Sequence, residues 1–151
     1  MIALKIGRHY KGAFKLTKQG QSLIGKPGQI FGIATSFYLF EIDHMRFSQI
    51  NTEPVRGNWN IFLNVLNVEA ENGAIGADIR RVLFGEAASS ANVYMMNYFY
   101  VQVLRPLCWT GLLHQQHGTD RFSLEDEKFT KTSLWEAALQ LGTDAMIRQS
   151  A

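Results

Sequence analysis

The chain has 151 residues, of which 46% are hydrophobic and 19% are charged, and its net charge is +2. This length is enough to bury one hydrophobic core and short for two ordinary domains, so we expect a single domain over residues 1–151. The composition excludes a disordered chain, and the single cysteine, Cys108, excludes an internal disulfide framework.

Neither a membrane span nor a signal peptide of the usual build is expected. The longest apolar runs are interrupted by polar residues well before the roughly 18 residues that a membrane helix needs. Lys5, Arg8 and Lys11 interrupt the first apolar residues. Together with the lone cysteine, these features predict a cytoplasmic protein with no membrane partner.

A basic β-hairpin is predicted at the start of the chain. Apolar and polar residues alternate over residues 2–8 and again over 13–16, and Gly12 lies between them at a position where a tight turn needs a positive φ. We expect Thr17 to cap a short helix that follows the hairpin and ends at Gly25.

Two apolar helices follow in the first half of the chain. Pro27 is placed to open a helix over residues 28–42. A further helical period runs over residues 59–71. We expect its polar positions to form one narrow solvated stripe, made of Asn60, Asn64, Asn67 and Glu71.

In the second half, residues 77–85 predict a short amphipathic helix that ends at Gly85, with Arg80 and Arg81 pointing outward. Ser89 or Ser90 is expected to cap a strongly apolar helix over residues 91–105, which Pro106 should stop.

A second hairpin and a last helix are predicted at the C-terminal end. Residues 108–116 should pair with residues 128–132, and Thr132 should cap the last helix, which we expect to be followed by a frayed tail over 143–151. The predicted fold class is therefore α+β and mostly α, with about five helices and two short β-hairpins.

The search for catalytic or metal-binding residues gives little. His114 and His117, with Asp120 and Cys108 nearby in sequence, form the one arrangement that is similar to a metal site, but their place at a strand end favours bystander histidines. Cys108 lies in an apolar run that favours a buried, inert thiol. Acidic residues 125–127 are interpreted as a solvated loop. We therefore expect no enzyme, no metal and no cofactor.

Positive charge is concentrated near the N-terminus. Residues 1–40 hold six Lys or Arg and no acidic residue, whereas the other 111 residues carry a net charge of −4. This asymmetry favours an anionic partner such as nucleic acid, although a solvated hairpin whose charges keep it soluble is the simpler alternative. The residues expected to contact nucleic acid are Lys5, Arg8, Lys11, Lys15 and Lys18.

Aromatic residues are concentrated in the helices expected over 28–42 and 91–105, which are apolar on nearly all sides. A domain of this size can lack the interior to cover both helices, and large exposed apolar patches mark interfaces, so we predict a homo-oligomer. The alternative is that both are central core helices. The predicted interface residues are Phe37, Tyr38, Phe40, Tyr94, Tyr98 and Tyr100.

Residues 8–31, 103–113 and 129–135 carry a family resemblance. With its Lys-Gly turn, Leu-Thr-Lys junction and Pro-Gly helix start, "RHYKGAFKLTKQGQSLIGKPGQIF" resembles a bacterial family of unknown function, some of whose members are attached to plasmid-type open reading frames. "VLRPLCWTGLL" and "FTKTSLW" are similar to that family's closing pieces. The chain is also similar in type to proteins encoded by mobile gene cassettes. The resemblance implies a winged-helix-like fold and brings no catalytic residues.

The sequence departs from a DNA-binding winged helix in one respect. The wing of such a domain follows the recognition helix, whereas here no helix is expected before the first hairpin, and the helix before the second hairpin presents one base, Arg105. The leading prediction is therefore a non-catalytic domain that self-associates through its aromatic helices. The alternatives are nucleic-acid binding through the basic hairpin and a small-molecule pocket among the aromatic helices.

Overall fold

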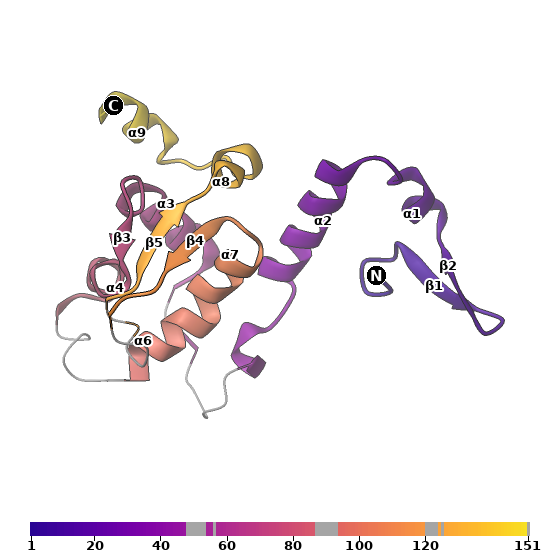
Figure 1. The fold of residues 1–151 in the computed structure, drawn as a ribbon, viewed down its shortest axis with the longest axis horizontal. Coiled ribbons are helices and arrows are strands. Elements are labelled where there is room, and N and C mark those ends of the chain that lie inside the picture. Colours follow the sequence, from indigo (N-terminus) through magenta and orange to yellow (C-terminus); the bar gives the residue numbers. More distant parts are fainter. Residues whose placement is uncertain (48–53, 56, 87–93, 120–123, 125, 151) are drawn as a thin grey trace. The chain divides into compact units, whose positions relative to one another are not determined.

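The computed structural model describes residues 1–47, 54–55, 57–86, 94–119, 124 and 126–150, with the side chains of residues 94–96 and 150 outside the description. The chain divides into two compact units, Met1–Ile42 (unit 1) and Asp43–Ala151 (unit 2). Its fold is α+β and mostly helical, which confirms the predicted class (Figure 1). The single-domain expectation stays a prediction.

Unit 1 consists of a β-hairpin and two helices. Its elements are β1 (Gly7–Tyr10), β2 (Ala13–Leu16), α1 (Lys18–Ser22) and α2 (Pro27–Phe40). The strands pair antiparallel, with Tyr10 opposite Ala13 and Gly7 opposite Leu16. The predicted hairpin, the short helix and the helix that begins at Pro27 are therefore confirmed. Two bounds differ from the prediction: the first strand is Gly7–Tyr10 instead of residues 2–8, and the short helix ends at Ser22 instead of Gly25.

The end of the hairpin is attached to α1 by a cap and a close backbone approach. Thr17 accepts a hydrogen bond from the Gly20 N–H at 3.1 Å, as a helix cap, and donates its hydroxyl to the Lys5 carbonyl at 2.7 Å. A Cβ atom at Gly20 would lie 2.0 Å from the Ile6 carbonyl oxygen. The approach of strand and helix therefore depends on a residue without a side chain.

Unit 2 combines helices with a small sheet. Its elements are η1 (His44–Phe47), α3 (Trp59–Glu69), β3 (Ala74–Ile75), α4 (Gly76–Phe84), α6 (Tyr94–Phe99), η2 (Tyr100–Leu104), α7 (Arg105–Trp109), β4 (Leu113–Gln116), β5 (Lys128–Lys131), α8 (Ser133–Ala138) and α9 (Asp144–Ser150). No helix in the described ranges has both the length and the apolar character to cross a membrane.

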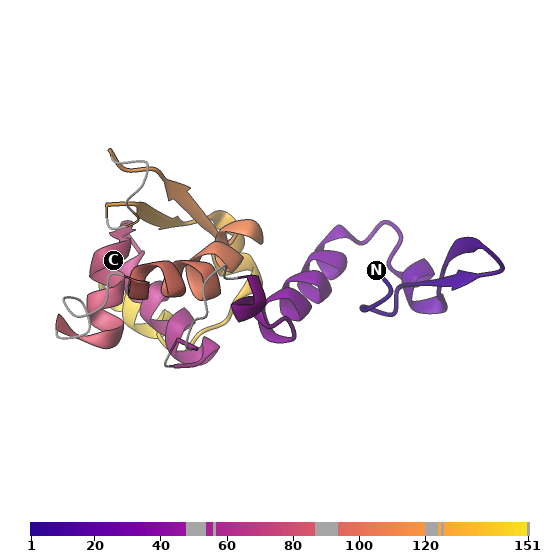
Figure 2. The same ribbon diagram turned by 90° about the horizontal axis from the view of Figure 1, so that it is seen from below.

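The sheet has the antiparallel order β3-β5-β4, and the predicted second hairpin is its β4–β5 pair. Helices of unit 2 gather on one face of this sheet (Figure 2). Leu113 and Phe129 point to that face and are buried, whereas His114 and Lys128 point away and are exposed. The strands thus alternate between core and solvent as a one-sided sheet requires.

Aromatic rings fill the core of unit 2. Phe99, Phe129 and Trp135 are the largest fully buried side chains. The Phe99 ring makes edge contacts with Phe62 of α3, at 6.3 Å between centroids, and with Phe84 of α4, at 5.7 Å. These contacts join α3, α4 and α6 around one buried ring.

Pro106 does not stop the apolar helix, so that prediction is wrong. The helix continues from α6 through η2 into α7 and ends before Gly111, whose φ is 76°. η2 is a π-helical turn, in which the Arg105 N–H bonds the Tyr100 carbonyl five residues back. The wider turn directly before Pro106 accommodates a ring that would collide with the preceding carbonyls in a regular α-helix.

The predicted solvated stripe on α3 is also wrong at its third position. Asn60 is exposed, but Asn67 is only 2% exposed. Its side-chain oxygen, Oδ1, accepts from the Trp135 indole N–H at 2.9 Å. Its side-chain nitrogen, Nδ2, donates to Thr143 Oγ1 at 2.9 Å and to Asp144 Oδ1 at 2.8 Å. These hydrogen bonds offset the cost of burying the amide.

Arg80 is a further correction. The sequence predicts that it points outward with Arg81, but Arg80 is buried on α4. Arg81 is on the solvent side, where it forms ion pairs with Asp78 at 2.8 Å and Glu86 at 3.2 Å. Neighbouring residues lie about 100° apart around a helix, so Arg80 and Arg81 point in different directions, and only Arg80 is buried.

Two further expectations concern a helix cap and the C-terminal tail. The Ser89 or Ser90 cap lies outside the described residues. The tail expected to fray contains α9, and Thr143 donates its N–H to Asn64 Oδ1 at 3.1 Å. Its fraying stays a prediction.

Candidate functional site

The candidate site is the basic face of the β1–β2 hairpin, which we define as Arg8, Tyr10, Lys11 and Lys15. Side chains alternate along a strand, and Arg8 lies opposite Lys15 while Tyr10 lies opposite Ala13. Arg8, Tyr10 and Lys15 therefore share one face of the ribbon. Lys11 joins them from the turn.

The Tyr10 ring is the centre of this face. The distance to its centroid is 5.0 Å from Lys15 Nζ, 5.5 Å from Lys11 Nζ and 5.6 Å from Arg8 Cζ. These distances are within the range of cation–π attraction, which offsets part of the repulsion among the three charges. Tyr10 is 43% exposed, so the ring and its cations are accessible from solvent.

The turn brings Lys11 to the ring. Lys11 has a φ of 49° and Gly12 a φ of 75°, so both central residues are left-handed, as in the hairpin turns whose twist matches that of paired strands. A Cβ atom at Gly12 would meet no atom within 4 Å. Gly12 is therefore required by its backbone conformation and not by lack of space.

The other face of the hairpin is apolar. Phe14 lies over Gly7, where a Cβ atom would come within 2.0 Å of the Phe14 ring. The His9 and Phe14 rings meet edge to face at 5.9 Å. The hairpin thus has one aromatic face and one basic face.

The structure brings together three of the five residues predicted to contact nucleic acid. Arg8, Lys11 and Lys15 surround Tyr10, whereas Lys5 and Lys18 are exposed outside this cluster. Lys5 has a left-handed φ of 56° and Lys18 begins α1. Tyr10 was not among the predicted site residues, because the sequence placed it in the turn that follows a strand over residues 2–8, whereas β1 extends to Tyr10.

The predicted interface residues have mixed environments. Phe37 and Tyr38 of α2 are half-buried, and Phe40 is exposed. Tyr98 is half-buried, and the side chain of Tyr94 lies outside the description. Tyr100 is used within unit 2, because its hydroxyl donates to Gln115 Oε1 at 2.9 Å. Burial is the first cause of the raised pKa of this phenol.

Glu127 departs from the predicted solvated loop. Its side chain is 5% exposed and is bound by the Gln115 amide and by His117 Nδ1, which lies 3.0 Å away. The His117 ring itself is 79% exposed. His114 points to the outer face of β4, and among the described residues there is no group of three or more potential ligands for a metal ion.

Cys108 lies on α7 and is half-buried. Burial, followed by the nearby Glu127 charge, raises the pKa of its thiol from the ordinary 9.0 to about 12. The thiol is therefore protonated at neutral pH, and a protonated thiol is a poor nucleophile.

The described residues define a protein in which a basic, aromatic-centred hairpin unit precedes an α+β unit in sequence. The family model of the y4jL C-terminal domain matches residues 48–133, more than half of the chain, and the chain belongs to this family. The matched range lies in unit 2 and contains most of the two closing stretches that carry the resemblance, whereas residues 8–31 lie outside it. No curated protein and no solved structure matches the chain.

Proposed function

We propose that this protein binds nucleic acid through the basic face of its N-terminal hairpin. The observation that carries the proposal is the arrangement of three cations within 5.6 Å of one exposed tyrosine ring. Unit 1 contains a single acidic residue, Glu41, so its field is strongly positive. A polyanion is the partner that such a field attracts most strongly.

Each component of the face has a role in this proposal. Arg8, Lys11 and Lys15 neutralise phosphates and release condensed counterions. Tyr10 stacks on a base or packs against a sugar. A two-stranded ribbon is narrow enough for the major groove of a duplex, and this use of a hairpin is similar to that of the wing in winged-helix proteins.

The proposal is tested by neutralising the three cations together. We expect the variant Arg8→Gln, Lys11→Gln, Lys15→Gln to bind DNA much more weakly in about 50 mM salt, because fewer counterions are released. The slope of log affinity against log salt should become shallower by about one for each phosphate that the variant no longer neutralises. Fluorescence anisotropy with labelled duplex and single-stranded oligonucleotides measures both quantities.

The matched control removes the same charge from unit 2, with Arg46→Gln, Arg105→Gln and Lys128→Gln. This control should keep most of the affinity if the hairpin is the contact surface. Equal weakening in the two variants would mean that only net charge matters. Absence of binding to both DNA forms by the unmodified protein in about 50 mM salt would refute the proposal.

A second candidate function is self-association through α2. Ile30 is 41% exposed and Phe40 is 53% exposed on this helix, and exposed apolar surface supports an interface between copies. Both candidates describe a cytoplasmic protein without catalytic activity, of the kind encoded on plasmids or mobile gene cassettes. In that setting, the hairpin would be the part of a small interaction domain that contacts an anionic partner.

A further inference from the structure

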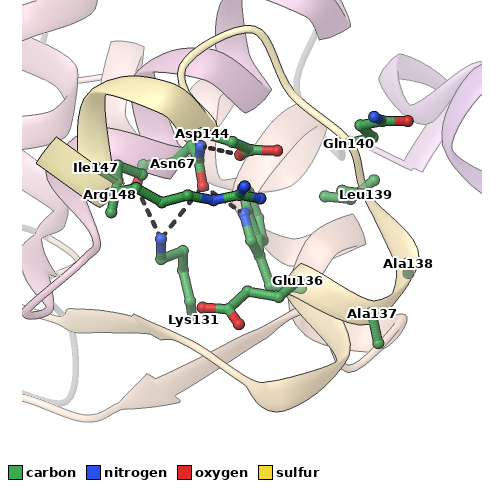
Figure 3. A pocket seen from close by; sticks show the side chains of 11 residues that line it. Asn67, Lys131, Glu136, Ala137, Ala138, Leu139, Gln140, Asp144, Ile147 and Arg148 are labelled. Carbon is green, nitrogen blue, oxygen red and sulfur yellow. Dashed lines mark hydrogen bonds between the residues drawn. The ribbon is translucent and has the colours of Figure 1, made fainter.

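Unit 2 contains a cavity of about 560 Å³ that no function discussed above uses. Its lining comes from α3, the end of β5, α8, the segment 139–140 and α9 (Figure 3). This volume is within the usual range for sites of small organic ligands. The cavity lies wholly within unit 2.

The inner wall of the cavity is polar and already fully bonded. Asn67 binds Trp135, Thr143 and Asp144, as described above. The Lys131 ammonium donates to the backbone carbonyl of Asn67 at 3.0 Å and forms an ion pair with Glu71. These groups form a rigid wall, and few of their donors and acceptors are free to hydrogen-bond a ligand.

Both carboxylate oxygens of Asp144 also accept hydrogen bonds from within the protein. Its Oδ1 accepts from Asn67, and its Oδ2 accepts from the Leu141 N–H at 2.9 Å. The bond from Leu141 is the main cause that holds the pKa of this carboxyl below its ordinary value of 3.8. Asp144 therefore acts as a cap of its own loop.

Two lining charges of opposite sign remain. Glu136 on α8 and Arg148 on α9 are exposed, and within the described ranges neither side chain forms a hydrogen bond or an ion pair. The charge of Arg148 also contributes to the lowered pKa of Asp144. Figure 3 shows both directed into the cavity. Apolar atoms of Ala137, Leu139 and Ile147 line the same space.

We propose that this cavity binds a free α-amino acid with an apolar side chain. The Arg148 guanidinium receives the ligand carboxylate, with the paired geometry that this group favours. The Glu136 carboxylate receives the ammonium group, and the apolar lining receives the side chain. A simple anion would use only Arg148 and a simple cation only Glu136, whereas a zwitterion uses both charges.

The bound ligand would connect α8 to α9, since its two charged groups are held by different helices. Bridging adds contacts between the C-terminal helix and the rest of unit 2, and a ligand that binds only the folded state stabilises it. The thermal midpoint should therefore rise with ligand concentration.

The test uses the full chain and L-leucine as the probe, with binding measured by isothermal titration calorimetry. L-leucinamide lacks the carboxylate and 4-methylpentanoate lacks the ammonium group. We expect both analogues to bind at least about tenfold more weakly than L-leucine, because each lacks one charge-assisted hydrogen-bonding group. No binding of L-leucine at millimolar concentration, or equal binding of all three compounds, would overturn the proposal.

Variants locate the site. Arg148→Gln and Glu136→Gln should each weaken leucine binding by about tenfold or more, whereas the matched surface controls Arg46→Gln and Glu86→Gln should change it less than about twofold. Circular dichroism establishes that each variant is folded. If the two pocket variants leave leucine binding unchanged, the proposal is wrong.

Discussion

Asn67 shows how one side chain can join distant segments of a chain. It lies on α3, and its amide bonds Trp135 on α8, Thr143 before α9, and Asp144, which are 68 to 77 positions later in the sequence. Both the nitrogen and the oxygen of the Asn67 side-chain amide are hydrogen-bonded. A buried amide of this kind is stabilising only while every partner is present, because each orphaned group keeps its full desolvation cost.

We therefore expect Asn67→Ala to destabilise the protein by about 2–4 kcal/mol. The substitution leaves the Trp135 indole N–H buried without its acceptor. Asn60→Ala, on the exposed side of the same helix, is the control and should change stability by less than about 0.5 kcal/mol. Urea unfolding followed by tryptophan fluorescence measures both, and similar destabilisation in the two variants would contradict this role of Asn67.

At the scale of elements, the junction between the hairpin and α1 depends on close backbone packing. Gly20 lies in the first helical turn after the Thr17 cap, where its Cα approaches the Ile6 carbonyl. The same junction fixes the base of the strands whose other end carries Tyr10. Disrupting it should therefore affect the basic face as well as α1.

Gly20→Ala tests this junction. The added methyl group would collide with backbone rather than with a flexible side chain, so we expect unit 1 to be destabilised by about 1–3 kcal/mol. Gly32→Ala is the matched control, because a Cβ atom at that helical position meets nothing within 4 Å. It should stabilise α2 by about 0.5–1 kcal/mol. Hydrogen exchange of the unit 1 amides measures both changes, and an unaffected Gly20→Ala variant would show that the junction can relax.

The apolar helix of unit 2 makes a related point about elements. A proline is expected to end a helix, yet α6, η2 and α7 form one continuous rod through Pro106. The π turn immediately before the proline explains the continuity. Because the rod extends past Pro106 to Trp109, it also carries Leu107, which is fully buried, as is Leu104 before the proline.

At the scale of the whole molecule, the two units differ in net charge and in the kind of partner that we propose for each. Unit 1 contains the basic face, and the family domain falls within unit 2, which has the opposite net charge. This division assigns the proposed polyanion contact to one unit and the proposed amino-acid site to the other. The two proposals can therefore fail independently.

Self-association is a prediction at this scale. Size-exclusion chromatography with light scattering should detect an oligomer at tens of micromolar if α2 forms an interface, and Ile30→Lys with Phe40→Lys should return it to monomer by placing charges on exposed apolar positions. Val82→Lys, at an exposed apolar position of α4, is the control. A monomer in the unmodified protein would remove the main support for this function.

Much of the local structure was predictable because it depends on neighbouring residues. The hairpin around Gly12, the Thr17 and Thr132 caps, the helix start at Pro27 and the helix end at Gly85 all follow from backbone preferences that each residue carries with it. The basic residues of the candidate face were also visible, since charge concentration is a property of sequence. Their arrangement around Tyr10 was not, because it depends on the register of two strands.

The sequence alone determined the two hairpins, the Thr17 and Thr132 caps, the helix start at Pro27 and the concentration of positive charge before Glu41, since each depends on short-range chemistry. Only the tertiary structure decided which polar side chains would be buried. Asn67, Arg80 and Glu127 all have side chains suited to solvent, and each is buried in the folded chain. It also decided that Glu136 and Arg148 line one cavity, because spatial proximity across twelve residues depends on how α9 returns to α3.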